Sequence, residues 1–264
     1  MKRRVLSVFF LLTVYAAAGW TQSLYSGAIL AAPKNRPNEP LEKGKQLFIQ
    51  GRTLFFSGRG NLDEAVKILT ASKEFLAKSG DDFENYYWRG EAEFVLAEIS
   101  EVKKDNRKAA QSFSESGKLA EKALTYDNNS SDCNRLVADT YMRLMNYNGT
   151  FYAMSRSSKT FKLLNKAVAL NKNNYPAYNS LAVCYFYTPS FAGGSIEKAM
   201  DSLRKALESK DPFTNFISYM WLGIVHEKKQ EKAKAVAYFS KALEIYPESP
   251  WAKEYLDKMK SSVP

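Results

Sequence analysis

The sequence predicts an all-α protein, a solenoid of about five antiparallel helix pairs followed by a C-terminal capping helix. Three observations support this fold class. Apolar residues recur at helical spacing along most of the chain, short stretches rich in Gly, Asn, Asp and Pro separate the helical segments, and small residues recur at matching places in successive segments. The chain has 264 residues, of which 45% are hydrophobic, so it can bury a core.

The clearest helix pair runs from Phe216 to Pro247. Its signature positions are Tyr219, Leu222, Gly223 and His226 in the first helix and Ala235, Phe239, Ala242 and Pro247 in the second. This spacing resembles a tetratricopeptide (TPR) repeat, in which small residues let two helices cross closely while bulky residues fill the groove beside them. One such pair cannot bury its apolar face alone, so the resemblance implies stacked neighbours.

Similar pairs precede this one and build a TPR-like domain over residues 41–260. We predict repeats at about residues 41–79, 83–127, 131–174, 175–212 and 216–249, and a capping helix at 250–260. Asp63 and Ser195 are expected to cap the helices that follow them. The central small residues of the two helices lie 19 positions apart in the last pair, but 24, 29 and 33 apart in the three pairs before it. Those three pairs therefore carry longer helices or protruding loops.

The N-terminus predicts a secretory signal peptide over residues 1–18. Lys2, Arg3 and Arg4 form a basic start, and the apolar run that follows ends in small residues at 16–18. Cleavage as late as residue 32 and an uncleaved membrane anchor are the alternatives. Residues 19–40 read as a linker, Pro-rich towards its end. We therefore expect export, into a bacterial periplasm.

Composition argues against several function classes. The formal net charge is +10, but the lysines are spread along helix exteriors and mixed with Glu, so no nucleic-acid partner is expected. Cys133 and Cys184 lie in the first helices of different repeats and predict two separate buried thiols. His226, the single histidine, occupies a packing position of the repeat, and no phosphate-binding loop or nucleophile elbow is present. The sequence thus predicts a non-enzymatic protein with no metal and no cofactor.

The remaining candidate for function is the concave side of the solenoid, which the first helix of each pair lines. The candidate partner-binding residues are Tyr87, Glu91, Phe94, Arg135, Asp139, Arg143, Asn179, Phe186 and Tyr187. Aromatic side chains mix here with charged ones, as they do in the energetic centres of protein interfaces. A second candidate is the loop after the seventh predicted helix-forming stretch, with Pro189, Phe191, Gly193 and Gly194 as its characteristic residues. This loop is either a shaped connection or a contact element beside the groove.

Enlarged repeats, a Pro-x-Phe-x-Gly-Gly loop and an export signal together resemble the T component associated with bacterial TRAP transporters. That resemblance implies a periplasmic helical protein that binds a substrate-binding protein and forms homo-oligomers. The chain departs from it in lacking a cysteine for lipidation. The rival hypothesis is a carrier of small amphipathic ligands, with Phe94, Phe186 and Tyr187 as the walls of a hydrophobic channel. In either case the expected role is binding rather than catalysis.

Overall fold

The computed structural model describes residues 38–261, and all regular structure within that range is helical. The predicted signal peptide, 1–18, and residues 19–37 of the predicted linker lie outside the described residues. The helices are α1 (Glu39–Ser57), α2 (Leu62–Ala77), α3 (Phe83–Val102), α4 (Asn106–Leu124), α5 (Ser131–Leu170), α6 (Tyr175–Tyr187), α7 (Ile196–Ala206), α8 (Pro212–Lys228), α9 (Lys232–Ile245) and α10 (Pro250–Ser261), with a short 3-10 turn, η1 (Ser190–Ala192). The all-α prediction is confirmed.

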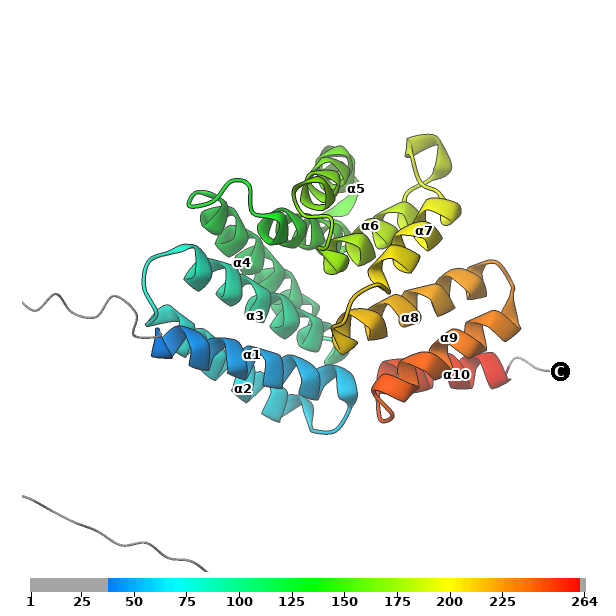
Figure 1. The fold of residues 1–264 in the computed structure, drawn as a ribbon, viewed down its shortest axis with the longest axis horizontal. Coiled ribbons are helices and arrows are strands. Elements are labelled where there is room, and N and C mark those ends of the chain that lie inside the picture. The colour runs from blue at the N-terminus through cyan, green and yellow to red at the C-terminus, as the bar shows by residue number, and fades with distance from the viewer. Residues whose placement is uncertain (1–37, 262–264) are drawn as a thin grey trace, which may run out of the picture. The chain divides into compact units, whose positions relative to one another are not determined.

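Successive helices lie side by side as antiparallel pairs, and Figure 1 shows these pairs following one another along a curve. Polar side chains at the breaks begin the helices. Ser195 accepts a hydrogen bond from the Lys198 amide at 3.2 Å, as predicted. The helix expected to be capped by Asp63 is instead capped by Asn61, which accepts from the Glu64 amide at 2.7 Å. The cap lies two residues earlier because Leu62 already has helical geometry.

The extra residues of the middle repeats are accommodated in two ways. Helices α3 and α4 have 20 and 19 residues with only residues 103–105 between them, so the second pair is long rather than looped. Helix α5 runs for 40 residues but breaks at Gly149, where φ is 76° and ψ is −177°. Its two limbs form the third pair. In the fourth pair the extra residues form the loop that contains η1.

Close helix crossings depend on the small residues of the signature. At Gly223 an added Cβ would overlap the ring of Phe239 in the facing helix. At Gly90 it would lie 3.1 Å from Leu136 of the next pair. Because neither side chain could move far in a packed interior, these glycines set the distance between neighbouring helices.

The first helix also contacts the end of the chain's helical region, as Figure 1 shows where α1 meets α8 and the α9–α10 connection. The guanidinium of Arg52 stacks on Phe213 at 4.0 Å, and the Phe56 ring meets Phe213 at 4.9 Å and Phe216 at 6.3 Å. An added Cβ at Gly58 would overlap the carbonyl oxygen of Glu248. We call this set of residues the closure contact, because it joins the first helix to the last repeat.

Candidate functional site

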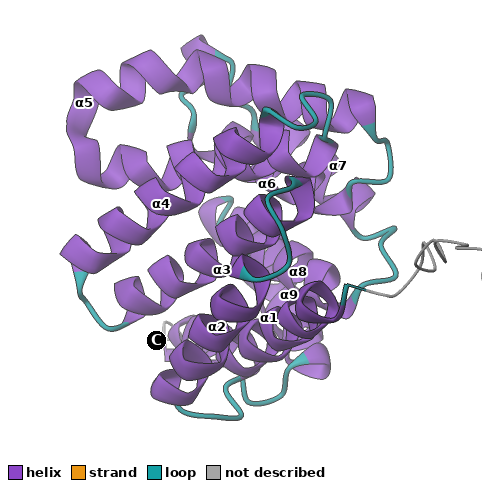
Figure 2. Cartoon of the chain, turned by 90° about the vertical axis from the view of Figure 1, so that its left-hand side faces the viewer, coloured by secondary structure: helices purple, strands orange, loops and turns teal. Residues whose placement is uncertain are grey.

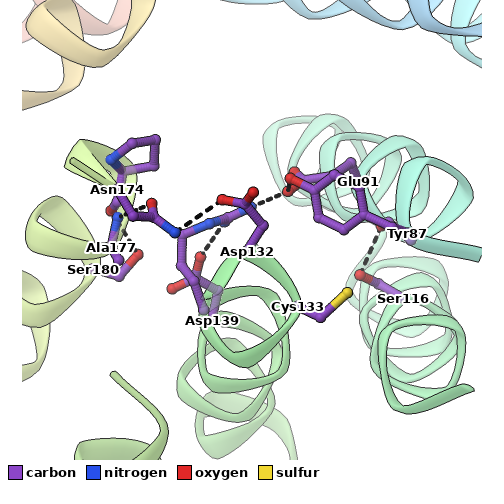
Figure 3. A network of polar contacts seen from close by, with 12 residues as sticks. Tyr87, Glu91, Ser116, Asp132, Cys133, Asp139, Asn174, Ala177 and Ser180 are labelled. Carbon is purple, nitrogen blue, oxygen red and sulfur yellow. Dashed lines mark hydrogen bonds and ion pairs between the residues drawn. The ribbon is translucent and has the colours of Figure 1, made fainter. Parts of the chain in front are cut away.

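A buried polar network connects the facing sides of α3 and α5. We call it the inner polar network and define it as Tyr87, Glu91, Glu98, Arg135 and Asp139. The Tyr87 hydroxyl donates to Glu91 at 2.8 Å, the Arg135 guanidinium donates to both Glu91 and Asp139, and the Arg135–Asp139 distance is 2.6 Å. Figure 3 shows Tyr87 and Glu91 on one side and Asp139 on the other.

Helix geometry explains why these side chains meet. Tyr87 and Glu91 are four residues apart on α3, and Arg135 and Asp139 are four residues apart on α5, so each pair shares a helix face. Glu98 follows Glu91 by two turns and therefore points to the same side of α3. The network thus brings together four of the residues that the sequence identified, and it adds Glu98, which the sequence analysis missed although its spacing from Glu91 could have revealed it.

Burial dominates the electrostatics of the inner polar network. Arg135 is 9% exposed and Asp139 is 8% exposed. Burial raises the pKa of Asp139 to about 6, with the Arg135 guanidinium opposing the shift. Burial also raises the pKa of Glu98 to about 7; the Arg143 guanidinium opposes this shift, and Asp139 and Glu91 add to it. Burial opposes the charge of Arg135, yet the neighbouring carboxylates, Glu91 first, raise its pKa well above the ordinary value.

Tyr87, Glu91, Arg135 and Asp139 of the inner polar network are already paired within the protein, so they have little left to offer a partner. A charge removed from water must be compensated by partners at hydrogen-bond distance, and here Arg135 finds them on two helices. The inner polar network therefore links α3 to α5 and fixes how the two helices are aligned along their lengths. Within residues 38–261 no group of three His, Cys, Asp or Glu side chains is arranged to hold a metal ion.

The other predicted groove residues lie apart from this network or extend it. Arg143 forms an ion pair with Glu101, further along the same two helices. Phe94 packs against Phe113 with ring centroids 5.1 Å apart and is half-buried in the core of the second and third pairs. Asn179 is buried, and its side-chain amide donates to the Thr214 carbonyl at 3.1 Å. Phe94 and Asn179 therefore serve packing between helices.

Three aromatic rings meet where the C-terminal end of α6 packs against the middle of α8. We call Phe186, Tyr187 and Trp221 the aromatic corner. Their ring centroids lie 5.1, 5.8 and 5.9 Å apart, and each pair is arranged edge to face. The ammonium group of Lys228 lies 4.4 Å from the centre of the Phe186 ring. The rings therefore hold one another in place without a bound partner.

One ring of the aromatic corner, Tyr187, faces solvent, whereas Phe186 is buried and Trp221 is half-buried. The Tyr187 side chain is 69% exposed, although it packs edge to face against two other rings. A shallow depression beside it is lined by Phe186, Tyr187, Ile224, Glu227 and Lys228. A second depression shares Phe186 and Lys228 with the first and extends to the predicted contact loop. The sequence analysis did not identify Trp221 or Lys228 as site residues, because neither occupies a TPR signature position. Each lies two residues after one, Tyr219 and His226 respectively.

The predicted loop residues shape this neighbourhood. Phe191 is 93% exposed at the tip of the loop, and Pro189 is also exposed. Gly193 has a φ of 99°, a conformation that favours glycine. An added Cβ at Gly194 would overlap the carbonyl oxygen of Thr188, so the loop can pass this close to α6 only with glycine there. The structure thus brings the loop and Tyr187 together as one exposed surface, whereas Phe186 is buried beneath it and serves packing.

The remaining reactive side chains are buried. Burial raises the pKa values of the Cys133 and Cys184 thiols to about 12, which keeps both protonated and unreactive at neutral pH. His226 is 6% exposed, stacks on Tyr238 with centroids 5.2 Å apart, and contacts Glu231 at 2.7 Å. It is a packing residue, as its place in the repeat indicated.

Comparison with solved structures confirms the TPR-like fold. The thermophilic TPR protein TTC0263 of Thermus thermophilus superposes with a TM-score of 0.59 at 17% identity, over 84% of this chain and 98% of that chain. IFIT1, in a structure with m7Gppp-AAAA, superposes with a TM-score of 0.56 at 15% identity, over 86% of this chain and 55% of that chain. At these identities the likeness concerns the fold alone.

Sequence comparisons are more specific. The BBSome complex member BBS4 of Mus musculus, like that of Bos taurus, is 27% identical over 100 residues, which is 38% of this chain. The match spans only 18% of those relatives. These comparisons do not support the resemblance to the TRAP transporter T component. The family model for regulator of microtubule dynamics protein 1-3 matches residues 55–263. The chain therefore belongs to the family of regulator of microtubule dynamics proteins 1-3.

Proposed function

We propose that this chain is a non-enzymatic scaffold that binds a protein partner, and that the aromatic corner with the adjoining loop is the anchor of that interaction. The observation that carries the proposal is the exposure of Tyr187, which is 69% accessible while two neighbouring rings fix its position. Large aromatic side chains that are rigid before binding contribute most to protein interfaces, because little conformational entropy is lost when a partner covers them.

The aromatic corner is a stronger candidate than the inner polar network. Arg135 and Asp139 are buried and paired, so a partner would have to break existing ion pairs to reach them. Tyr187 and Phe191 have no such competing partners and lie beside shallow depressions. A partner's apolar side chain could enter a depression and cover both rings.

Family membership and sequence suggest different partners. The family's name refers to microtubule dynamics, which makes a microtubule-associated protein or tubulin a candidate. BBS4 is named as a member of a multi-protein complex, which supports binding to protein in general. We further propose that residues 1–18 export or anchor the chain, on the sequence pattern alone. If the chain is exported, the partners that we propose are a periplasmic substrate-binding protein of a TRAP-type transporter and a second copy of the chain.

A photo-crosslinking amino acid at position 187 tests the site in the native cell. We expect one protein to be crosslinked in stoichiometric yield from position 187, and none from position 102, where Val102 is 58% exposed. With that protein purified, Tyr187→Ala is expected to weaken binding about thirtyfold, as truncation of an interface hot spot does. Val102→Ala is the control and should leave the affinity unchanged.

Other outcomes would overturn the proposal. Crosslinking from both positions to many proteins would indicate non-specific association rather than a specific binding site. A partner whose affinity is unaffected by Tyr187→Ala binds elsewhere. Recovery of a bound small amphipathic molecule from the purified chain, with no protein partner, would favour the carrier hypothesis.

A further inference from the structure

Charge is distributed unevenly along the chain. Residues 140–196 contain no Asp or Glu, although the whole chain has 28 acidic residues. The same stretch contains six basic residues, which are Arg143, Arg156, Lys159, Lys162, Lys166 and Lys172. It therefore supplies more than half of the net charge of +10. Most of this stretch is α5 after its break and α6.

The second limb of α5, residues 150–170, presents one face to solvent. Phe151 is 90% exposed and Met154 is 72% exposed at the start of this limb. Lys162 follows Phe151 by 11 positions, about three helical turns, and so lies on the same side of the helix. Lys159 and Lys166 flank it and are exposed as well. We call this surface, Phe151, Met154, Lys159, Lys162 and Lys166, the α5 outer face.

The lysines of the α5 outer face are not neutralised by carboxylates. The Lys159 ammonium donates to the Tyr141 hydroxyl at 2.9 Å, and that of Lys166 donates to the Asn128 carbonyl at 2.8 Å. The nearest acid in this chain of contacts is Glu121, which accepts a hydrogen bond from Tyr141. Among the described residues neither these two lysines nor Lys162 forms an ion pair with an acidic side chain.

The break at Gly149 places the apolar end of this face at a bend. Gly149 has no atom of another residue near the position a Cβ would take, which shows that the bend lies in open space. Figure 2 shows the bend of α5 at one edge of the molecule. Phe151 and Met154 therefore project from a convex tip rather than lining a groove, and the lysines continue behind them along the helix.

We propose that the α5 outer face docks on the surface of an anionic phospholipid bilayer, with Phe151 and Met154 entering the headgroup region and the lysines contacting lipid phosphates and carboxylates. A bilayer offers both a negative surface and a shallow apolar layer, and this face offers the complementary pair. An acidic polypeptide would use the lysines but would leave the two projecting apolar side chains exposed. The docking is peripheral, since no helix within residues 38–261 is long and apolar enough to span a membrane.

The test uses the full chain with an environment-sensitive fluorophore on a Met154→Cys variant. Cys133 and Cys184 are buried and protonated, so labelling is selective for the new thiol. We expect a blue shift on vesicles of phosphatidylcholine containing about one third phosphatidylserine, and none on phosphatidylcholine alone. A label on Phe75→Cys in α2, where the native side chain is 37% exposed, is the control and should not shift. Because the signal is local, binding through the N-terminal segment cannot imitate it.

Single substitutions measure how much each side chain contributes to binding of the anionic vesicles. Lys162→Gln is expected to weaken binding to the anionic vesicles about fivefold, as loss of one surface cation does. Phe151→Ala should weaken it about tenfold through loss of apolar contact. Lys67→Gln, an exposed lysine of α2, should have no effect. Equal shifts at positions 154 and 75, or a response of position 154 to polyglutamate but not to vesicles, would overturn the proposal.

Discussion

Glu98 is a carboxyl group whose ionisation depends strongly on the fold. Burial on α3 raises its pKa to about 7; the Arg143 guanidinium opposes this shift, and the carboxylates of Asp139 and Glu91 add to it. A carboxyl group whose pKa is higher in the native than in the unfolded protein binds more protons when folded. Its contribution to stability is therefore present below its ordinary pKa of 4.5 and is lost as the pH rises through 7.

We expect the free energy of unfolding to fall by about 2 kcal/mol between pH 5 and pH 8 because Glu98 must ionise in a buried position. In Glu98→Gln this part of the pH dependence should disappear, and the variant should be more stable than the wild type at pH 8. Urea unfolding at both pH values measures the difference. A variant with the wild-type pH dependence would show that Asp139, whose pKa is also raised, accounts for the effect.

Residue positions on a helix face could be predicted, but their burial could not. Counting from the small residue of each repeat correctly put Tyr87, Glu91, Arg135 and Asp139 on facing sides of two helices. Whether such a face is open or covered depends on how far apart neighbouring helices stand. That distance is set by residues elsewhere, such as Gly90 against Leu136, and no local pattern encodes it.

At the scale of single elements, α5 shows what local signals can and cannot specify. Asn148-Gly149 is a turn-forming dipeptide, and the chain does turn there at a positive φ. The same signal did not indicate how short the break is: a single residue leaves helical geometry, and the two limbs run together as one bent element. Similarly, the spacing of small residues predicted extra length in the second pair, but it left open that the length lies in α3 and α4 themselves.

Gly149→Ala tests the importance of this break. The combination of φ 76° and ψ −177° is essentially restricted to glycine, so an added Cβ should destabilise the fold by about 2 kcal/mol even though no neighbour is close. Urea denaturation measures the loss. Asn146→Ala, an exposed site in the first limb of α5, is the control and should change stability by less than about 0.5 kcal/mol. An unaffected Gly149→Ala variant would mean that the two limbs can join through another backbone conformation.

For the helical region as a whole, the feature that sequence reasoning missed is the closure contact. Repeats specify how each pair stacks on the next, whereas the approach of α1 to α8 depends on the accumulated rotation of all the pairs between them. Nothing in the sequence around the side chains of the closure contact indicates that they meet. Arg52 and Phe56 look like an ordinary first-helix face, and Phe213 looks like the start of α8.

The closure contact should hold the first and last repeats together, and Phe213→Ala tests this. Removing the ring takes away a contact that Arg52 and Phe56 share. We expect small-angle X-ray scattering to show the radius of gyration rising by about a tenth, because a solenoid released at its ends is less compact than a closed one. Phe83→Ala is the matched control, since Phe83 also starts a first helix but stacks on Tyr87, away from the contact.

A double-mutant cycle separates loss of the contact from general loss of stability. Arg52→Ala and Phe213→Ala should show a coupling energy of about 1 kcal/mol, the size of a partly desolvated cation–π interaction, because each change removes the same contact. If the two changes were additive and the scattering of Phe213→Ala matched that of the wild type, then α1 would be positioned by α2 and α3 alone. The partner-binding surface around Tyr187 would then lie on an array whose ends are independent of each other.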